Sequence, residues 1–314
     1  MVRVATWNLE NLFRPGGESG PDTDQQYQEK LRSLAGTITT MNPQVLAVQE
    51  VGDPDALDDL VGRLPGRWHT ALAAPDGRGI RVGFLSRSPL ADAEEVAEFP
   101  AELPDVQISD DGETTRRMSR PLLRARVEVD GAELTLMTCH LKSKLLTYPG
   151  GRFTPRDEGE RARSAVYALN RRAAEAATVR TDVNAVLEGR GQDRAAIVLG
   201  DLNDTQHAAT TALLQGPPGS EIGTGGFERA DDGDGARLWN LAPLIPEGER
   251  HSRTYRSRPE LIDHILVSHA LVTSVETVRT LDTEPGSVTD RPGERRNEPS
   301  SDHRPVLADF TPPA

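Results

Sequence analysis

The spacing of apolar residues predicts alternating strands and helices from the first residues onward. Residues 2–9, VRVATWNL, alternate apolar and polar side chains, which predicts a strand. Residues 23–41 carry apolar side chains at helical spacing, and the Asn42-Pro43 pair that follows is a helix stop. The next stretch, PQVLAVQE, is almost continuously apolar, as in a strand that is covered on both faces.

The rest of the chain continues this alternation, with more strands than helices. Polar segments rich in glycine or proline predict loops at 143–160, 216–236 and 283–300. Strands are expected at 68–74, 80–86, 122–129, 133–141, 195–203, 253–257, 261–268, 275–281 and 303–310, and helices at 54–63, 160–188 and 206–215. This pattern favours the α+β class, with two packed sheets and helices outside. Because no repeat or linker interrupts it, we expect residues 1–314 to form one domain.

Composition limits the class of protein. The hydrophobic fraction of 36% and the mean hydropathy of −0.51 indicate a soluble globular chain. No apolar run approaches the ~20 residues of a membrane helix, and the N-terminus lacks a signal-peptide pattern. The single cysteine, Cys139, excludes an intrachain disulfide and is expected to pack in the core. We therefore expect a cytoplasmic monomer without a membrane span, while secretion with a trimmed signal stays open.

The charge distribution bears on the partner. The formal net charge is −13, so a long polyanion meets repulsion unless metal ions or a local basic patch reverse it. Only three residues are lysine, and two of them, Lys142 and Lys144, fall in the short motif HLKSK. Because nearly all the other basic residues of the chain are arginines, this placement indicates a site whose function requires lysine rather than arginine.

Polar residues with metal-binding capacity recur where apolar strands stop. Each of them alone also has a structural explanation, as a turn residue, a helix cap or a hydrogen-bonded core histidine. Asp263 is the hardest to explain in this way, because an unpaired carboxylate within an apolar strand is costly to bury. A structural explanation for every one of these residues at once is less probable than such an explanation for any single residue. The set is Asn8, Glu10, Glu50, His140, Asp201, Asn203, Asp263, Asp302 and His303.

The chemistry of these side chains indicates a hard divalent cation. Carboxylate and amide oxygens suit Mg²⁺ or Mn²⁺, which keep room for water and for substrate phosphate. Histidines beside such a site can bind or protonate phosphate oxygens. A structural zinc site is not expected with one cysteine.

The order of the motifs resembles the endonuclease/exonuclease/phosphatase superfamily, which includes deoxyribonuclease I. The motifs are TWNLENLF, the QE pair at 49–50, HLKSK, GDLND, IDHILVS and SDHRP, and the resemblance covers about residues 4–310. It implies a four-layer α/β/β/α sandwich of two mainly antiparallel sheets. It also implies a divalent-metal-dependent phosphodiester hydrolase in which water attacks phosphorus in line.

The resemblance also implies roles for individual residues. Glu50, Asn8 and Asp302 match metal-site residues. Asp201 matches the group that orients or deprotonates water, and Asn203 matches a phosphate contact. The two histidines that flank the phosphate are His140 and His303, with Asp263 as the partner of His303. Lys142 and Arg120 are expected to bind substrate phosphate.

The chain departs from the family pattern at several positions. Glu10 stands where aspartate is frequent and is not assigned to the metal site, and His264 is interpreted as packing. The sequence does not identify a carboxylate that orients His140. The basic and aromatic residues of the 143–160 loop either clamp the substrate or form a solvated loop, and Arg256 is a weaker phosphate-binding candidate.

The sequence supports three hypotheses. The first is a nuclease that uses Mg²⁺ or Mn²⁺. The alternative enzyme acts on a small-molecule or lipid-headgroup phosphoester, and the net charge of −13 favours it. The third hypothesis, a binding scaffold without activity, is disfavoured by the complete set of acids and histidines.

Overall fold

The computed structural model describes residues 1–225, 227 and 229–311, and its strands form two six-stranded sheets. The first sheet has the order β15-β16-β1-β2-β4-β3 and the second the order β11-β14-β10-β9-β8-β5. Most neighbouring strands pair antiparallel, and the β1–β2 and β9–β10 pairs are parallel. The expected pair of mainly antiparallel sheets is confirmed.

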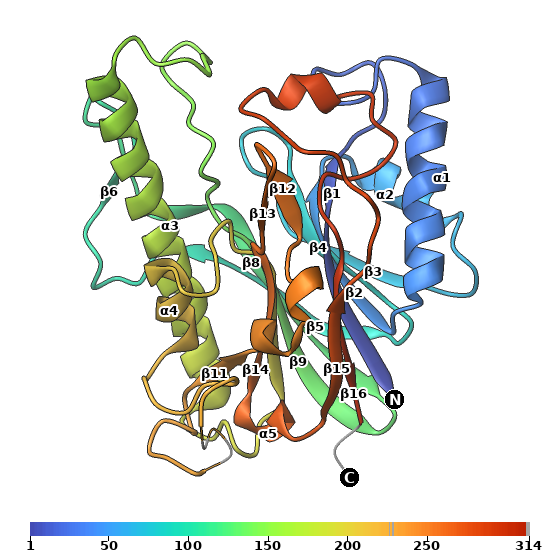
Figure 1. The fold of residues 1–314 in the computed structure, drawn as a ribbon, viewed down its shortest axis with the longest axis vertical. Helices are drawn as coiled ribbons and strands as arrows, with labels where there is room; N and C mark the ends of the chain where they lie inside the picture. The colour runs from blue at the N-terminus through green and yellow to red at the C-terminus, as the bar shows by residue number, and fades with distance from the viewer. Residues whose placement is uncertain (226, 228, 312–314) are drawn as a thin grey trace.

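The sheets pack face to face, and helices cover both outer faces (Figure 1). Helix α1 (Asp24–Met41) and helix α2 (Pro54–Val61) share a hydrophobic cluster with the outer face of the first sheet. Helix α3 (Glu158–Leu187) and helix α4 (Ala209–Gln215) cover the second sheet in the same way. A third cluster lies between the sheets. The expected four-layer α/β/β/α arrangement is therefore confirmed.

The strands of the first sheet are β1 (Val2–Leu12), β2 (Val45–Val51), β3 (His69–Leu72), β4 (Arg81–Ser86), β15 (Val275–Thr280) and β16 (Val306–Phe310). Those of the second are β5 (Leu90–Glu98), β8 (Arg117–Val129), β9 (Ala132–His140), β10 (Ala196–Asp201), β11 (Leu238–Asn240) and β14 (Asp263–Ser268). Two small hairpins pair β6 (Val106–Gln107) with β7 (Thr114–Thr115) and β12 (Arg253–Tyr255) with β13 (Arg258–Glu260). Short helices complete the order: α5 (His269–Val272), η1 (Ala242–Leu244), η2 (Glu247–Glu249) and η3 (Pro292–Arg295).

Strand β5 is the largest element that the apolar pattern did not predict. Its sequence, LADAEEVAE, mixes alanine with acidic residues, and most of the strand is exposed. It lies at the edge of the second sheet and pairs with β8 alone. An edge strand with an exposed face buries too few side chains to show a period-two apolar pattern.

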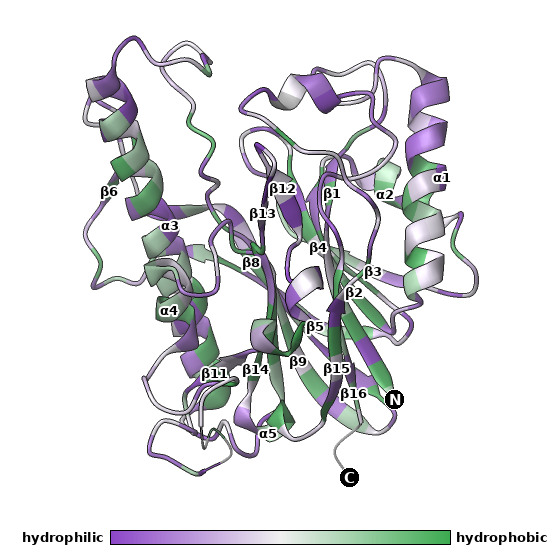
Figure 2. Cartoon of the chain, viewed as in Figure 1, coloured by the Kyte–Doolittle hydropathy of each residue, from purple (hydrophilic) through white to green (hydrophobic). Residues whose placement is uncertain are grey.

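Hydrophobic residues are concentrated on the strands and on the inner faces of the helices, whereas the loops at the upper end of the sheets are mostly hydrophilic (Figure 2). The polar residues that end β9 and β10 and the one that begins β14 therefore lie at the border between a buried core and polar loops. In the part of the chain that the structure describes, no helix combines the length and the apolar character needed to cross a membrane.

Gly200 allows β9 and β10 to approach each other directly before Asp201. Its φ is +150°, and a Cβ atom there would lie 2.0 Å from the carbonyl oxygen of Cys139. We expect Gly200→Ala to lower the free energy of unfolding by about 2–3 kcal/mol, because the strands must separate around the methyl group. Urea denaturation measures this, and Gly112→Ala, in an exposed turn with nothing near the added Cβ, is the control for positive φ alone. Equal losses in the two variants would show that packing between β9 and β10 is not the cause.

Candidate active site

Three adjacent strands bring His140, Asp201 and Asp263 to neighbouring positions at one end of the second sheet. In the strand register, Asp201 of β10 lies opposite His140 of β9 on one side and opposite Asp263 of β14 on the other. Side chains alternate between the faces of a strand, and these three share the face of Leu136, Ile197 and Ile265, which belong to the core between the sheets. The apolar strands thus carry three ionisable side chains to the mouth of the space between the sheets.

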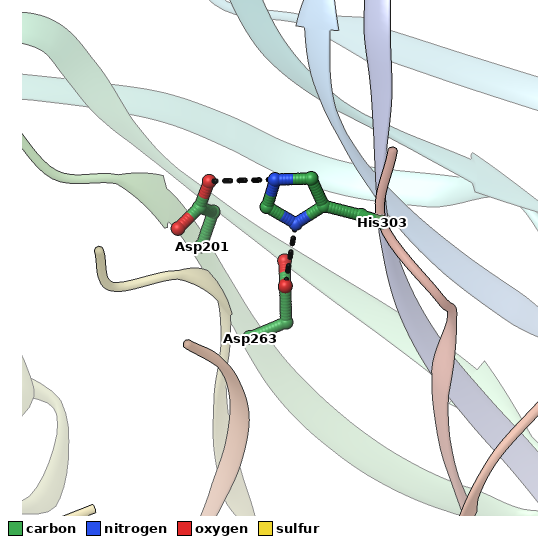
Figure 3. A group of neighbouring side chains, drawn as sticks. All are labelled: Asp201, Asp263 and His303. Carbon is green, nitrogen blue, oxygen red and sulfur yellow. Dashed lines mark hydrogen bonds and ion pairs between the residues drawn. The ribbon is translucent and has the colours of Figure 1, made fainter. Parts of the chain in front are cut away.

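His303 reaches this cluster from the segment that precedes β16. Its Nδ1 lies 2.7 Å from Asp263 Oδ2, and its Nε2 lies 3.9 Å from Asp201 Oδ2 (Figure 3). The backbone of His303 is held by the Trp7 indole, whose Nε1 donates to the His303 carbonyl at 2.8 Å. The Ser301 hydroxyl accepts a bond from the His303 amide and donates one to the Asn8 carbonyl. His303 is therefore fixed from several sides.

Burial and charge set the protonation of this cluster. Burial and the neighbouring Asp263 carboxylate raise the pKa of Asp201, which is 1% exposed, to about 7. Burial alone lowers the pKa of His303, but the carboxylates of Asp263 and Asp302 outweigh it and raise that pKa to about 10. His303 is thus an imidazolium at neutral pH, able to donate through both ring nitrogens.

His140 lies on the other side of Asp201 and differs from His303 in its charge. Its Nε2 lies 3.4 Å from Asp201 Oδ2, while its buried Nδ1 has no hydrogen-bond partner among the described residues. Burial and the positive charge of Arg120 lower the pKa of His140 well below the usual value for histidine. Asp201 is the carboxylate next to His140, and no orienting carboxylate is found at Nδ1 in the described part of the chain.

Asn8 connects this cluster to Glu50 on the first sheet. The Asn8 amide nitrogen donates to Glu50 Oε1 and to Asp201 Oδ2, both at 3.1 Å. The second oxygen of Glu50 accepts a bond from the Asn11 backbone amide at 3.0 Å. The two sheets therefore meet at one hydrogen-bonded row of side chains.

Unusual backbone geometry explains how Glu50 reaches this position. Strict alternation along β2 would turn Glu50 toward helix α1 together with Leu46 and Val48. The pairing of β1 with β2 instead shifts register between Asn8 and Leu12, and Glu50, Glu10 and Asn11 adopt φ of 60°, 49° and 52°. Positive φ is strained for residues other than glycine, and such strain tends to gather at functional sites.

Glu10 is occupied by a different set of contacts. Its carboxylate pairs with Arg295 through two hydrogen bonds of 2.7 and 2.9 Å and accepts the Asp302 backbone amide at 2.8 Å. Burial and the nearby Asp302 carboxylate raise the pKa of Glu10 to about 7. Lys30 of α1 is also buried, and the charges of Glu10 and Asp302 act on it. Glu10 is thus engaged with protein groups rather than turned toward an open site.

Two groups of side chains could hold a cation. Asp201, Asp263 and His303 offer ligand atoms that all lie within 4.8 Å of one another, but the proton held on His303 opposes metal binding there. Glu50, Asn8 and Asp302 offer oxygen donors, and the side-chain oxygen of Asn11 beside them is buried without a hydrogen-bond partner among the described residues. Such a hard donor set, with an unsatisfied oxygen, fits Mg²⁺ or Mn²⁺.

The predicted phosphate-binding residues lie at the edge of the cluster. Arg120 is buried and pairs with Asp76 at 3.0 Å, and its guanidinium also donates to the carbonyls of His140 and Leu141. These contacts favour a role in positioning the end of β9. Among the residues that the structure describes, Lys142 Nζ makes only long bonds, of 3.2 to 3.4 Å, to Ser143 and Leu145 in its own loop.

Asn203 continues from Asp201 and is held by two hydrogen bonds. Its backbone amide donates to Asp201 Oδ1 at 2.8 Å, and its side chain donates to the Leu141 carbonyl at 3.0 Å. Its φ of 52° turns the chain sharply after β10. The GDLND segment therefore holds Asp201 and Asn203 on one rigid turn.

Other candidate residues have structural partners. Lys144 pairs with Asp204 at 2.9 Å, and Arg152 pairs with Glu160 at 2.7 Å. Arg256 pairs with Asp290 in the neighbouring loop. The expected packing roles of His264 and Cys139 are confirmed, since both are buried and His264 Nε2 bonds the Asp204 carbonyl.

The sequence analysis missed three residues that support the site. Ser301 stands inside the SDH motif, so its position was a usable signal. Arg295 lies in a polar loop, and Glu175 lies in the middle of α3, where no local pattern marks them. Glu175 accepts bonds from Ser119 and from the Lys142 backbone amide and so holds the chain after β9.

Comparison with known proteins gives a consistent result. A model of the Endonuclease/Exonuclease/phosphatase family matches residues 5–303. Comparison with curated protein sequences found no match. Solved structures with the same fold include an AP endonuclease from Archaeoglobus fulgidus, at 15% identity and a TM-score of 0.57, with 99% of each chain covered.

Two further structures show that differently named proteins share the fold. A mannosyl-6-phosphatase from Bacteroides thetaiotaomicron has 17% identity and a TM-score of 0.57, covering 99% of this chain and 100% of that one. The human nocturnin catalytic domain, with bound sulfate, has 17% identity and a TM-score of 0.56, covering 99% and 94%. At these identities the similarity establishes the fold and leaves the substrate undetermined.

Proposed function

Because the chain belongs to the Endonuclease/Exonuclease/phosphatase family of phosphoester-hydrolysing enzymes, we propose that it is a divalent-metal-dependent phosphodiester hydrolase, with nuclease activity. The observation that supports this most is the register of β9, β10 and β14, which sets His140, Asp201 and Asp263 side by side beneath His303. We further propose that residues 1–314 act as one domain, as a monomer in the cytoplasm.

The metal belongs on the Glu50 side of the site. Glu50, Asn8 and Asp302 would hold Mg²⁺ or Mn²⁺, with the Asn8 amide also tying Glu50 to Asp201. When bound, such a cation offsets negative charge on the phosphate and on the leaving oxygen. The carboxylates of Glu50 and Asp302 give this side of the site an excess of negative charge, which a cation would balance.

The side chains of the protein then supply the remaining steps. Asp201 accepts a proton from the attacking water, whose oxygen forms a bond to phosphorus while the bond to the ester oxygen opposite breaks. Asn203 and the positive charge of Lys142 contact the phosphate, and Arg120 fixes the end of β9 behind it. His140 and His303 flank the phosphate, and the imidazolium of His303, held by Asp263, donates to an oxygen on which charge grows.

A substrate panel tests this proposal. The protein is incubated with plasmid, single-stranded DNA, RNA, bis-p-nitrophenyl phosphate and p-nitrophenyl phosphate, each with Mg²⁺, Mn²⁺ or EDTA. Metal-dependent cleavage of polynucleotides supports the nuclease. Cleavage of the small esters with polynucleotides untouched contradicts it and supports the second candidate, a small-phosphoester hydrolase, which the net charge of −13 favours.

Metal binding should depend on Glu50 far more than on Glu10. We expect Glu50→Gln to raise the Kd for Mn²⁺ at least about tenfold, because the loss of even a supporting group costs a metal site 10- to 100-fold. Glu10→Gln should change that Kd much less, because Arg295 and the Asp302 amide already occupy the Glu10 carboxylate. Mn²⁺ titration followed by electron paramagnetic resonance measures both, and a larger loss in Glu10→Gln would reverse the assignment.

Phosphate binding by Lys142 predicts a pH-dependent KM. Burial and the charge of nearby Arg120 lower the pKa of Lys142 to about 8, so its amine is cationic below that pH and neutral above it. We expect KM for a phosphodiester to rise above pH 8 while kcat changes less, since the lost charge serves binding. Lys144→Arg is the matched control and should keep this dependence, whereas Lys142→Ala should abolish it. A wild-type KM that stays constant from pH 7 to 9 would rule Lys142 out as the titrating group.

A further inference from the structure

A cavity of about 340 Å³ adjoins the candidate active site, between the loop after β9, helix α3 and the segment that joins β6 to β7. This volume is within the range of small-molecule sites. Lys142 forms part of its wall and follows His140 by two residues. The charge of Lys142 also acts on His140, so Lys142 is the residue that connects the cavity with the candidate site.

Two buried polar atoms from this wall lack partners. Ser109 Oγ and Arg171 Nε have no hydrogen-bond partner among the described residues. Arg171 Nε lies 3.4 Å from a Glu175 oxygen, but that oxygen already accepts the Ser119 amide and hydroxyl. Buried polar groups are normally hydrogen-bonded, but neither of these atoms is open to the cavity, so the rings and charges of its lining determine what it binds.

The same cavity contains flat apolar surface. It is lined by Tyr148 and Tyr167, two of the four tyrosines in a chain with only 4% aromatic residues. The hydroxyl of Tyr167 donates to Asp110 at 3.0 Å and accepts from Gln107 at 3.3 Å, which fixes the ring. Leu146 lies in the same wall. Rigid aromatic rings next to aliphatic groups favour a planar or ring-shaped ligand.

The charges of the lining limit what can enter. Lys142, which follows His140 by two residues, and Arg171 provide positive charge in the wall. Two of the four lining carboxylates, Asp110 and Glu160, are paired with Arg163 and Arg152. The other two, Asp111 and Glu113 on the segment between β6 and β7, are exposed and acidic. The cationic part suits a phosphate, whereas the acidic part repels a second phosphate and accepts hydrogen bonds from hydroxyl or amine groups. The fitting ligand has one phosphate and an uncharged ring with donors.

We propose that this cavity binds the uncharged ring, of a nucleoside or a sugar, in a small phosphodiester whose phosphate is hydrolysed at the neighbouring site. The hydrolysis rests on the phosphodiester hydrolysis of the proposed function, and the inference favours its second candidate, the small-phosphoester hydrolase, over the nuclease. Ring binding is measurable without hydrolysis. A long polynucleotide would bring further phosphates toward Asp111 and Glu113, so the cavity selects small diesters.

Three diesters that release 4-nitrophenolate test the selection: the methyl, thymidine-5′ and glucose-6 esters of 4-nitrophenyl phosphate. We expect kcat/KM for at least one ring ester to exceed that of the methyl ester by about tenfold or more, because stacking of a base on aromatic side chains has an effect of this size. The better of the two ring esters identifies the ring. Ser164→Trp, which fills the cavity from α3, should bring the ratio to about one, and Tyr167→Ala should lower it. Val166→Ala, at an exposed position of α3, is the control and should keep the ratio.

A wild-type ratio near one, or a ratio that survives in Ser164→Trp, overturns the inference. If no diester is hydrolysed, the proposed function fails and calorimetry decides the inference separately. Thymidine 5′-monophosphate or glucose 6-phosphate should then bind metal-free wild type at least about tenfold more tightly than Ser164→Trp, with methyl phosphate binding equally to both. Equal binding of both ring phosphates to the two proteins overturns the inference even in an active enzyme.

Discussion

Asp201→Asn should lower kcat for phosphodiester hydrolysis about 10³-fold while leaving the melting temperature near that of the wild type. The loss is expected because asparagine cannot accept the proton of the attacking water, and general-base catalysis contributes 10²–10⁴-fold. Stability should change little. The variant weakens the hydrogen bond from Asn8, but it also removes a buried negative charge next to Asp263. Steady-state kinetics with saturating Mn²⁺ and a thermal unfolding curve measure the two effects.

The pH profile distinguishes a base from a residue that only maintains structure. The pKa of Asp201 is raised to about 7, so its carboxylate is protonated below that pH and available as a base above it. Wild-type kcat/KM, which reports the free enzyme, should therefore rise with pH through about 7, and Asp201→Asn should lose this rise. Asp204→Asn is the matched control, because Asp204 lies three residues further along and pairs with Lys144 and Arg172. A variant at Asp201 that retained a tenth of kcat would exclude it as the base.

The strands could be predicted where runs of apolar residues indicate burial directly. The continuous apolar runs of β2 and β10 identify strands covered on both faces, and the polar residues that follow them identify the functional end of the sheets. Strand β5 gave no such signal, because an exposed edge strand needs no apolar face. The order of the strands within a sheet could not be predicted either. In the first sheet β16 pairs with β1, and β15 follows it, although both come from the far end of the chain.

The site was predictable as a list of residues and much less so as a geometry. The position of Asp263 within an apolar strand predicted a buried partner for its carboxylate, and His303 is that partner. The orientation of Glu50 depends on a positive φ and a register shift, which no residue type at that position requires. The contact of Glu10 with Arg295 links residues at opposite ends of the chain across a polar loop, so no local pattern could have indicated it.

The pairing of His303 with Asp263 predicts that their substitutions do not add. We expect His303→Ala to lower kcat about 10²–10³-fold, as for removal of one donor to a developing charge, with little change in melting temperature. Asp263→Asn should lower kcat by a smaller factor, and the double variant should fall no further than His303→Ala, because Asp263 acts through the 2.7 Å contact with Nδ1.

Proton affinity provides a second readout for the same pair. The Asp263 and Asp302 carboxylates raise the pKa of His303 to about 10, so wild-type kcat should fall only when His303 loses its proton at alkaline pH. Removing the Asp263 charge lowers that pKa, and the alkaline fall of kcat in Asp263→Asn should begin at a lower pH. Ser301→Ala is the control for the position of His303. Ser301 is uncharged and binds the backbone of His303 and of Asn8, so this variant should leave the alkaline limb in place. Multiplicative losses in the double variant, together with an unmoved alkaline limb in Asp263→Asn, would mean that Asp263 acts independently of His303.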